Sequence, residues 1–258
     1  MIPEVKHISP DLELYVYDLP TLCLDTISLI NRNLVEICEG ESDTSLDAAK
    51  LTFLDFLSNK DDTTKIGAVA EFFIHLFLRE LGYKQEFLFY NLEERSIKKG
   101  FDGYFSQGET QFIVESKSGF ESTRNISHKA KIKEAYNDIV STIGGASKKS
   151  AKGQNNPWRN AYNHASHIDV NTKKSIRNNL KELSDLFDQG IYQQIENFNV
   201  IPCSSLFLDD EWSAHFSESI LAEDDVFFLA LKAKTLKVVC ITNKTIAAFL
   251  AYLEGRNE

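Results

Sequence analysis

The sequence predicts one mixed α/β domain with an N-terminal α/β addition. Two observations favour this class. Segments with apolar residues at helical spacing alternate with short strand-like runs, and no internal repeat or low-complexity linker divides the 258 residues. We assign residues 1–64 to an acidic addition and residues 65–258 to the main domain, which includes a polar, basic excursion at 146–172.

The N-terminal addition contains one strand-like run, at residues 12–17, and two helical patterns, at 25–39 and 45–57. A polar break at 58–62 ends it and supplies capping residues for the next helix. The segment has thirteen acidic and four basic residues, so we expect an acidic surface.

The main domain begins with a helix over residues 65–81 that is apolar nearly all round, as in a buried helix. Strands are predicted at 85–90, 101–105 and 110–117, the last two joined as a hairpin, and a helix at 126–143 follows. The remaining predicted elements are a helix near 173–189, a strand near 198–208, a helix from about 209, a strand at 236–241 and a helix at 243–254.

Composition excludes several classes of protein. No stretch of about 18 apolar residues is present, so we expect no membrane partner. The first residues lack the basic region and apolar core of a signal peptide, and the four cysteines have no C-x-x-C spacing. These features predict a cytoplasmic protein without structural zinc or disulfides.

The net charge of -10 argues against a nucleic-acid partner, but the charge is unevenly distributed. Residues 125–182 contain eleven basic and four acidic side chains. Because charges act over about 8–10 Å at moderate salt, such a segment can contact a phosphate backbone beside acidic ends. A solvated, lysine-rich helix surface is the alternative interpretation.

Four charged residues lie in apolar surroundings: Glu71 within the apolar helix, Asp102 within the GFDGYF run, and Glu115 and Lys117 at the end of a strand. Burying a carboxylate is unfavourable unless it is paired, protonated or bound to a cation. Structural salt bridges would also satisfy these residues.

Strand geometry favours a shared site. Glu115 and Lys117 are two residues apart and therefore point to one face. A turn on Gln107-Gly108 places Asp102 opposite Ile113 and diagonal to Glu115, about 7–8 Å away between backbones. Two carboxylates without His or Cys suit Mg²⁺ or Mn²⁺.

The order of a helix with Glu71, a GFDG strand, a turn and an ESK strand followed by a helix resembles the PD-(D/E)xK restriction-endonuclease-like superfamily. This resemblance implies an αβββαβ core, with a mixed sheet flanked by helices. It also implies that Glu71, Asp102, Glu115 and Lys117 are catalytic, and that the acids and the backbone carbonyl of Ser116 bind metal.

A narrower similarity, in residues 66–145, is to the HamA family of nuclease subunits from bacterial Hachiman anti-phage defence systems. It implies a helicase partner of the HamB type and DNA as substrate. A non-cleaving nuclease-fold adaptor that binds DNA or the helicase is the alternative. The expected nucleic-acid-binding residues are Lys129, Lys133, Lys148, Lys149, Lys152 and Arg159.

Overall fold

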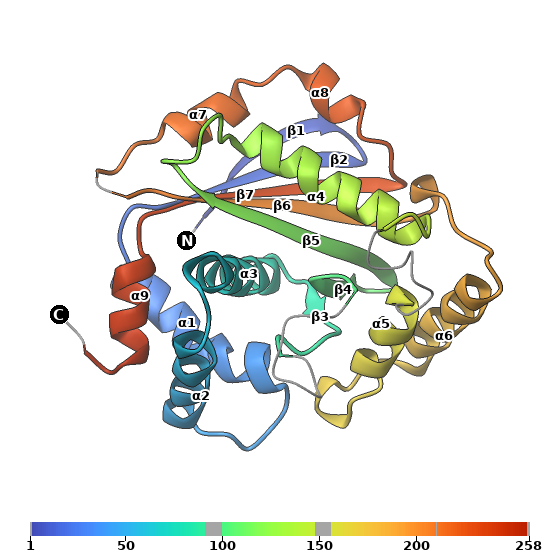
Figure 1. Cartoon of the computed structure of the whole chain (residues 1–258), viewed down its shortest axis with the longest axis horizontal. Coiled ribbons are helices and arrows are strands. Elements are labelled where there is room, and N and C mark those ends of the chain that lie inside the picture. Colours follow the sequence, from blue (N-terminus) through green and yellow to red (C-terminus); the bar gives the residue numbers. More distant parts are fainter. Residues whose placement is uncertain (1, 91–99, 148–155, 210, 257–258) are drawn as a thin grey trace.

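The computed structural model describes residues 2–90, 100–147, 156–209 and 211–256, and it contains a seven-stranded mixed sheet (Figure 1). The strand order is β1-β2-β7-β6-β5-β4-β3. Pairing is parallel from β2 through β7 and β6 to β5, and antiparallel at both ends. The strands are β1 (Glu4–Ser9), β2 (Leu12–Leu19), β3 (Lys84–Gln85), β4 (Gly103–Gln107), β5 (Thr110–Phe120), β6 (Asn199–Phe207) and β7 (Thr235–Asn243).

Helices cover both faces of this sheet (Figure 1). One face carries α3 with α1, α2 and α9, and the other carries α4 with α7 and α8. Helix α6 lies beside the start of β5, where Asn179 Nδ2 donates to Gln111 Oε1. The helices are α1 (Leu24–Glu39), α2 (Leu46–Ser58), α3 (Asp62–Glu80), α4 (His128–Ile143), α5 (Pro157–Ala165), α6 (Lys174–Asp188), α7 (His215–Leu221), α8 (Asp225–Leu229) and α9 (Ile246–Leu253).

Each face of β5 packs into its own hydrophobic layer because side chains alternate along a strand. Phe112 and Val114 belong to the layer that contains α3, whereas Ile113 belongs to the layer that contains Ile132 of α4. The predicted buried helix is confirmed: nearly all of α3 from Ile66 to Leu78 is buried. The structure is therefore α/β with a mixed sheet between two helical layers.

The N-terminal 64 residues contribute to the same sheet and the same core as the rest of the chain. Strand β2 pairs with β7, and Phe53 of α2 contacts Phe72 of α3 with ring centroids 5.4 Å apart. The predicted boundary at residue 64 falls in the first turn of α3, a helix that packs with α2 in one hydrophobic layer.

The structure differs from the predicted elements in several places, and the strand expected at 101–105 is Gly103–Gln107. The strand expected at 85–90 is limited to Lys84–Gln85, because the chain then leaves the sheet and Phe89 N donates to Ile37 O of α1. The helix expected from Asp209 begins at His215. The sequence did not predict β1, an edge strand with few apolar residues.

Within the described ranges, no helix is long and apolar enough to cross a membrane. The described part of the 146–172 excursion contains α5 and a 3₁₀ turn at Ile168–Val170.

Candidate active site

Strands β4 and β5 form a hairpin that turns on Gly108-Glu109, with Gly108 at a φ of 63°. The predicted register is wrong, because Ile113 pairs with Tyr104 rather than standing opposite Asp102. A shift of two residues keeps Asp102 on the expected face of the sheet. It also moves Asp102 from a diagonal position to one beside Glu115.

Asp102 directly precedes β4, where the backbone pairing with β5 ends. Its carboxylate, rather than a backbone carbonyl, accepts the next hydrogen bond from β5. Its Oδ2 accepts a hydrogen bond from the backbone N–H of Ser116 at 2.7 Å. The N–H and C=O of one strand residue point to the same side of the strand. The Ser116 carbonyl therefore points to the edge of β5 beyond the end of its pairing with β4. The structure therefore places Asp102 next to Ser116, the residue whose carbonyl the resemblance assigns to the metal.

Lys117 forms ion pairs with two carboxylates, those of Glu115 and Asp138. Its Nζ lies 2.8 Å from Glu115 Oε1 and 2.7 Å from Oδ2 of Asp138, a residue of α4. Glu115 and Lys117 thus share the α4 face, as predicted from their spacing. The lysine side chain is 19% exposed and Asp138 is 48% exposed, so the cluster opens to solvent through α4.

The electrostatics of the cluster follow from its burial. Burial and, after it, the charge of Asp102 raise the pKa of Glu115 to about 8, against the opposing effect of Lys117. Burial alone would lower the pKa of Lys117, but Glu115, Asp102 and the hydrogen bond to Asp138 outweigh burial and raise it. The two carboxylates repel each other, so a further cation beside them would stabilise their ionised forms.

Sequence reasoning missed Asp138. Helical spacing places Asp138 beside the buried face that contains Ala135 and Ile139, but it does not show what that face contacts. Only the docking of α4 on β5 shows that this acid meets Lys117.

A buried polar row lies next to the cluster on the same face. His128 Nδ1 is 2.8 Å from Ser204 Oγ, its Nε2 is 3.1 Å from Thr242 Oγ1, and Ser217 Oγ connects that threonine to Asp18. Because Ser217 donates to the Asp18 carboxylate, the bonds all run in one direction, which makes His128 a donor at Nε2 and an acceptor at Nδ1. Burial lowers the pKa of His128 to about 3, so it is neutral. Ser204 is the β6 partner of Lys117, so this row fixes the strand beside the cluster.

Glu71 lies on the other face of the sheet. It is buried on α3, and its Oε1 is 3.7 Å from His75 Nε2. The His75 ring packs against Phe105, and a Cβ at Gly103 would come within 3.4 Å of its Nε2. Glu71 and His75 therefore approach β4 from the α3 side, whereas Lys117 and Asp138 lie on the α4 side.

The donor set suits a hard divalent cation, although the described residues contain no group of three or more His, Cys, Asp or Glu side chains that could hold a metal ion. Asp102, Glu115 and the Ser116 carbonyl are all oxygen donors, and Mg²⁺ commonly uses one or two carboxylates and keeps several waters. The chemistry of this set fits Mg²⁺ or Mn²⁺, with water at the remaining positions. In the structure Lys117 is the cation at Glu115.

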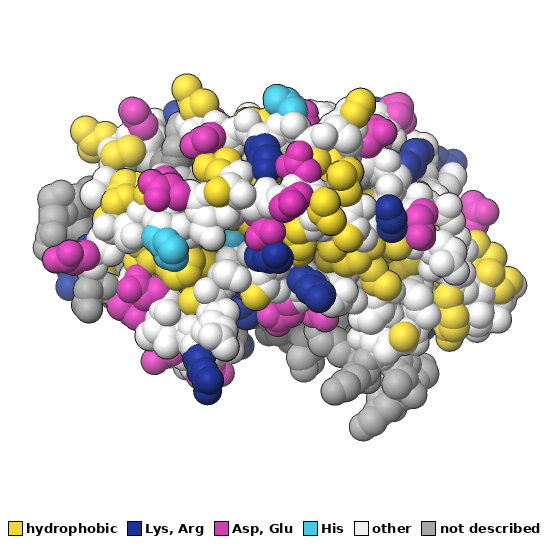
Figure 2. Space-filling view, turned by 90° about the horizontal axis from the view of Figure 1, so that it is seen from above, with side chains coloured by type: hydrophobic (Ala, Val, Ile, Leu, Met, Phe, Trp, Pro, Cys, Tyr) yellow, Lys and Arg dark blue, Asp and Glu magenta, His cyan; other side chains and the backbone are white. Residues whose placement is uncertain are grey.

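The predicted nucleic-acid-binding residues do not form one basic patch in the described part of the chain. Lys129 pairs with Glu223 at 2.8 Å and Arg159 pairs with Asp188, whereas Lys133 is exposed on α4. Figure 2 shows basic and acidic side chains interspersed on the face that carries α4. Lys148, Lys149 and Lys152 lie outside the described residues.

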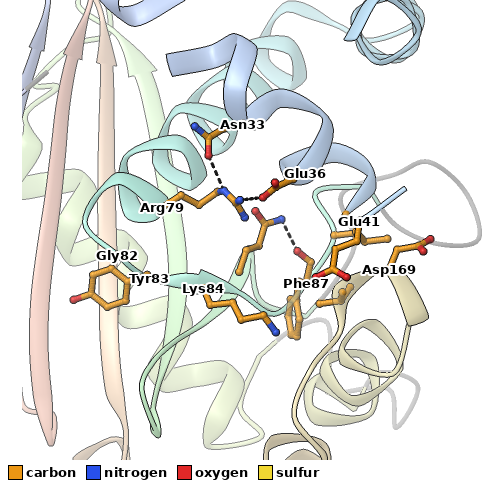
Figure 3. Close-up of a pocket in the computed structure, with 13 residues that line it drawn as sticks. Asn33, Glu36, Glu41, Arg79, Gly82, Tyr83, Lys84, Phe87 and Asp169 are labelled. Carbon is orange, nitrogen blue, oxygen red and sulfur yellow. Dashed lines mark hydrogen bonds and ion pairs between the residues drawn. The ribbon is translucent and has the colours of Figure 1, made fainter. Parts of the chain in front are cut away.

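A separate polar cavity of about 360 Å³ lies at the end of α3 (Figure 3). Asn33 and Glu36 hold the guanidinium of Arg79, and Lys84 Nζ donates to Asn171 O at 2.7 Å. Both cations of the cavity already have partners, and three acids also line it, so it lacks the unpaired positive charge that a phosphate ligand requires. Those acids are Glu36, Glu41 and Asp169.

No protein-family model matches the chain, and no curated protein matches its sequence. The functional assignment therefore depends on the geometry of the Asp102, Glu115, Lys117 and Asp138 cluster.

Proposed function

We propose that the protein is a Mg²⁺- or Mn²⁺-dependent nuclease that hydrolyses phosphodiester bonds in DNA. The observation that carries this proposal is the joining of Asp102 to the Ser116 amide beside the Glu115–Lys117 pair. Two carboxylates, a backbone carbonyl and a lysine thus meet at the point where one strand of a hairpin ends.

The order of elements supports the finer assignment to the restriction-endonuclease-like class. Helix α3, strands β3, β4 and β5, helix α4 and strand β6 follow one another as helix, three strands, helix and strand. In this order Glu71 is on α3, Asp102 directly precedes β4, and Glu115 and Lys117 are on β5, which supports the PD-(D/E)xK assignment.

In this mechanism Asp102, Glu115 and the Ser116 carbonyl would hold the cation. A divalent ion bound there would act as a Lewis acid and make water more acidic. Lys117 orients the attacking water and counters negative charge on the phosphate, and Asp138 fixes the position of the Lys117 ammonium. The resemblance also assigns Glu71 to the site, but Glu71 is buried on the α3 face of the sheet and has no step in this scheme.

The resemblance to Hachiman nuclease subunits extends the proposal to anti-phage defence with a HamB-like helicase as partner. The acidic N-terminal region would offer such a partner a docking surface. Lys129, Lys133, Arg159 and the lysines of the excursion would contact DNA. Purified helicase subunit and this chain should then co-elute in size-exclusion chromatography, and separate elution would contradict the partnership.

Cleavage of supercoiled and linear DNA tests the enzymatic proposal. The wild type should cut DNA with Mg²⁺ and should not cut it with EDTA. Lys117→Ala should abolish cutting, because the attacking water and the phosphate charge lose the lysine ammonium. Lys237→Ala is the matched control, since Lys237 is also a strand lysine, 15% exposed, that is paired with a glutamate. Full activity of Lys117→Ala, or equal loss in both variants, would contradict the assignment.

A non-cleaving adaptor is the second candidate. It is favoured by the absence of a three-acid group among the described residues and by the position of Lys117 between two carboxylates. An adaptor would bind DNA or the helicase with and without Mg²⁺ and would leave DNA intact even in the complex.

A further inference from the structure

An apolar groove lies between the beginning of α1 and helix α9. These two elements lie far along the sheet from the β4–β5 hairpin (Figure 1). The groove has a volume of about 590 Å³ and lies beyond the carboxyl ends of β2 and β7. Ligands of open α/β sheets commonly bind at that edge, and ligand clefts commonly have volumes of about 300–1,000 Å³. The groove therefore has the position and size of a ligand site.

Aliphatic side chains form most of the groove. Leu22, Leu24 and Ile27 line it from α1 and the loop before it, and Ala248 and Ala251 line it from α9. Leu24 is 82% exposed, so an aliphatic ligand that covered it would remove apolar surface from water.

The charges of the groove are all positive. Lys244 and Arg256 are its charged lining residues, although the chain as a whole has a net charge of -10. Arg256 pairs with Glu254, while Lys244 has no carboxylate partner among the described residues. The first turn of α9 also lacks a side-chain cap and an acidic residue, and the N-terminus of a helix carries partial positive charge. An anionic group would thus be stabilised at one end of the groove.

The groove offers little that would recognise a nucleotide or a sugar. Besides the two cations, its hydrogen-bonding side chains are Thr21, Thr245 and Tyr252. Thr245 Oγ1 donates to Asn243, and the Tyr252 hydroxyl donates to Asn31. Both side chains are therefore committed within the protein.

We propose that this groove binds a small amphipathic anion, an aliphatic chain that ends in a carboxylate. The chain packs on Leu22, Ile27 and Ala248, and the carboxylate lies by Lys244 and the uncapped end of α9. This inference does not depend on the nuclease proposal, because the groove shares no residue with the Asp102–Lys117 cluster.

Decanoate, below its critical micelle concentration, is a suitable probe for isothermal titration calorimetry of the full chain. We expect saturable binding at one site, at least ten-fold weaker binding to Lys244→Glu, and loss of binding in Ala248→Trp, which fills the groove. Lys234→Glu is the control, because this exposed lysine lies outside the groove and should leave the affinity unchanged. Decylammonium should bind at least ten-fold more weakly than decanoate.

Cys23 gives an independent readout without a new label. It precedes Leu24 and is exposed, whereas Cys38, Cys203 and Cys240 are buried. Decanoate should slow iodoacetamide modification of Cys23 in the wild type and not in Ala248→Trp. Absence of saturable decanoate binding, equal binding of decylammonium, or binding that survives Ala248→Trp would each overturn the proposal.

Discussion

The charged side chains on the two faces of β5 have different surroundings. On the α3 face, Glu71 and His75 are enclosed among aromatic rings in a continuous hydrophobic layer. On the α4 face, Glu115 and Lys117 lie beside a strand end and reach solvent through Asp138. Burial alone therefore does not identify a reactive site, because the α4 cluster also has an incomplete strand edge at which a ligand can bind.

Truncation of an aromatic residue on the α3 face should produce the largest loss of stability. Phe72 is fully buried and contacts Phe53, Phe73, Phe89 and Phe249. Phe72→Ala should lower the free energy of unfolding by about 3–5 kcal/mol, measured by urea denaturation. A loss below about 1 kcal/mol would show that this face is not the main packing layer.

Glu115→Gln should change how the free energy of unfolding depends on pH. The folded-state pKa of Glu115 is about 8, above its ordinary value of 4.5, so the unfolded chain binds fewer protons between these values. The stability that this group contributes is full below about pH 4.5 and is lost as pH rises through about 8.

Urea denaturation of both proteins in EDTA measures this effect. The wild type should lose stability relative to Glu115→Gln as pH rises from 5 to 9. A difference between the two proteins that is constant with pH, or that favours the wild type at high pH, would contradict the raised pKa.

Asp138→Asn should have the smallest effect on folding. The Asp138–Lys117 pair is half exposed at the aspartate, so its loss should cost at most about 1 kcal/mol. Cleavage should nevertheless fall by about 10–100-fold, the range for residues that orient a catalytic group. Unchanged cleavage by the purified variant would show that Asp138 does not position Lys117.

The sequence allowed the central grouping to be predicted, because strand alternation places Glu115 and Lys117 on one face and the hairpin returns Asp102 to them. The register was wrong because two adjacent two-residue turns were compatible with the Gly108 region, and only the observed pairing distinguishes them. Asp138 and the His128 row could not be derived, since both depend on how α4 docks on strands that are distant in sequence. The face occupied by Glu71 also depends on which side of the sheet α3 covers.

Binding of Mn²⁺, followed by electron paramagnetic resonance, tests the cation site most directly. The account predicts saturable binding to the wild type that is at least about 100-fold weaker in Asp102→Asn, because this change removes one of two carboxylate ligands and keeps the size of the side chain. Glu254→Gln, at an exposed carboxylate outside the site, should bind as the wild type does. Equal Mn²⁺ affinity in the wild type and Asp102→Asn would contradict the account.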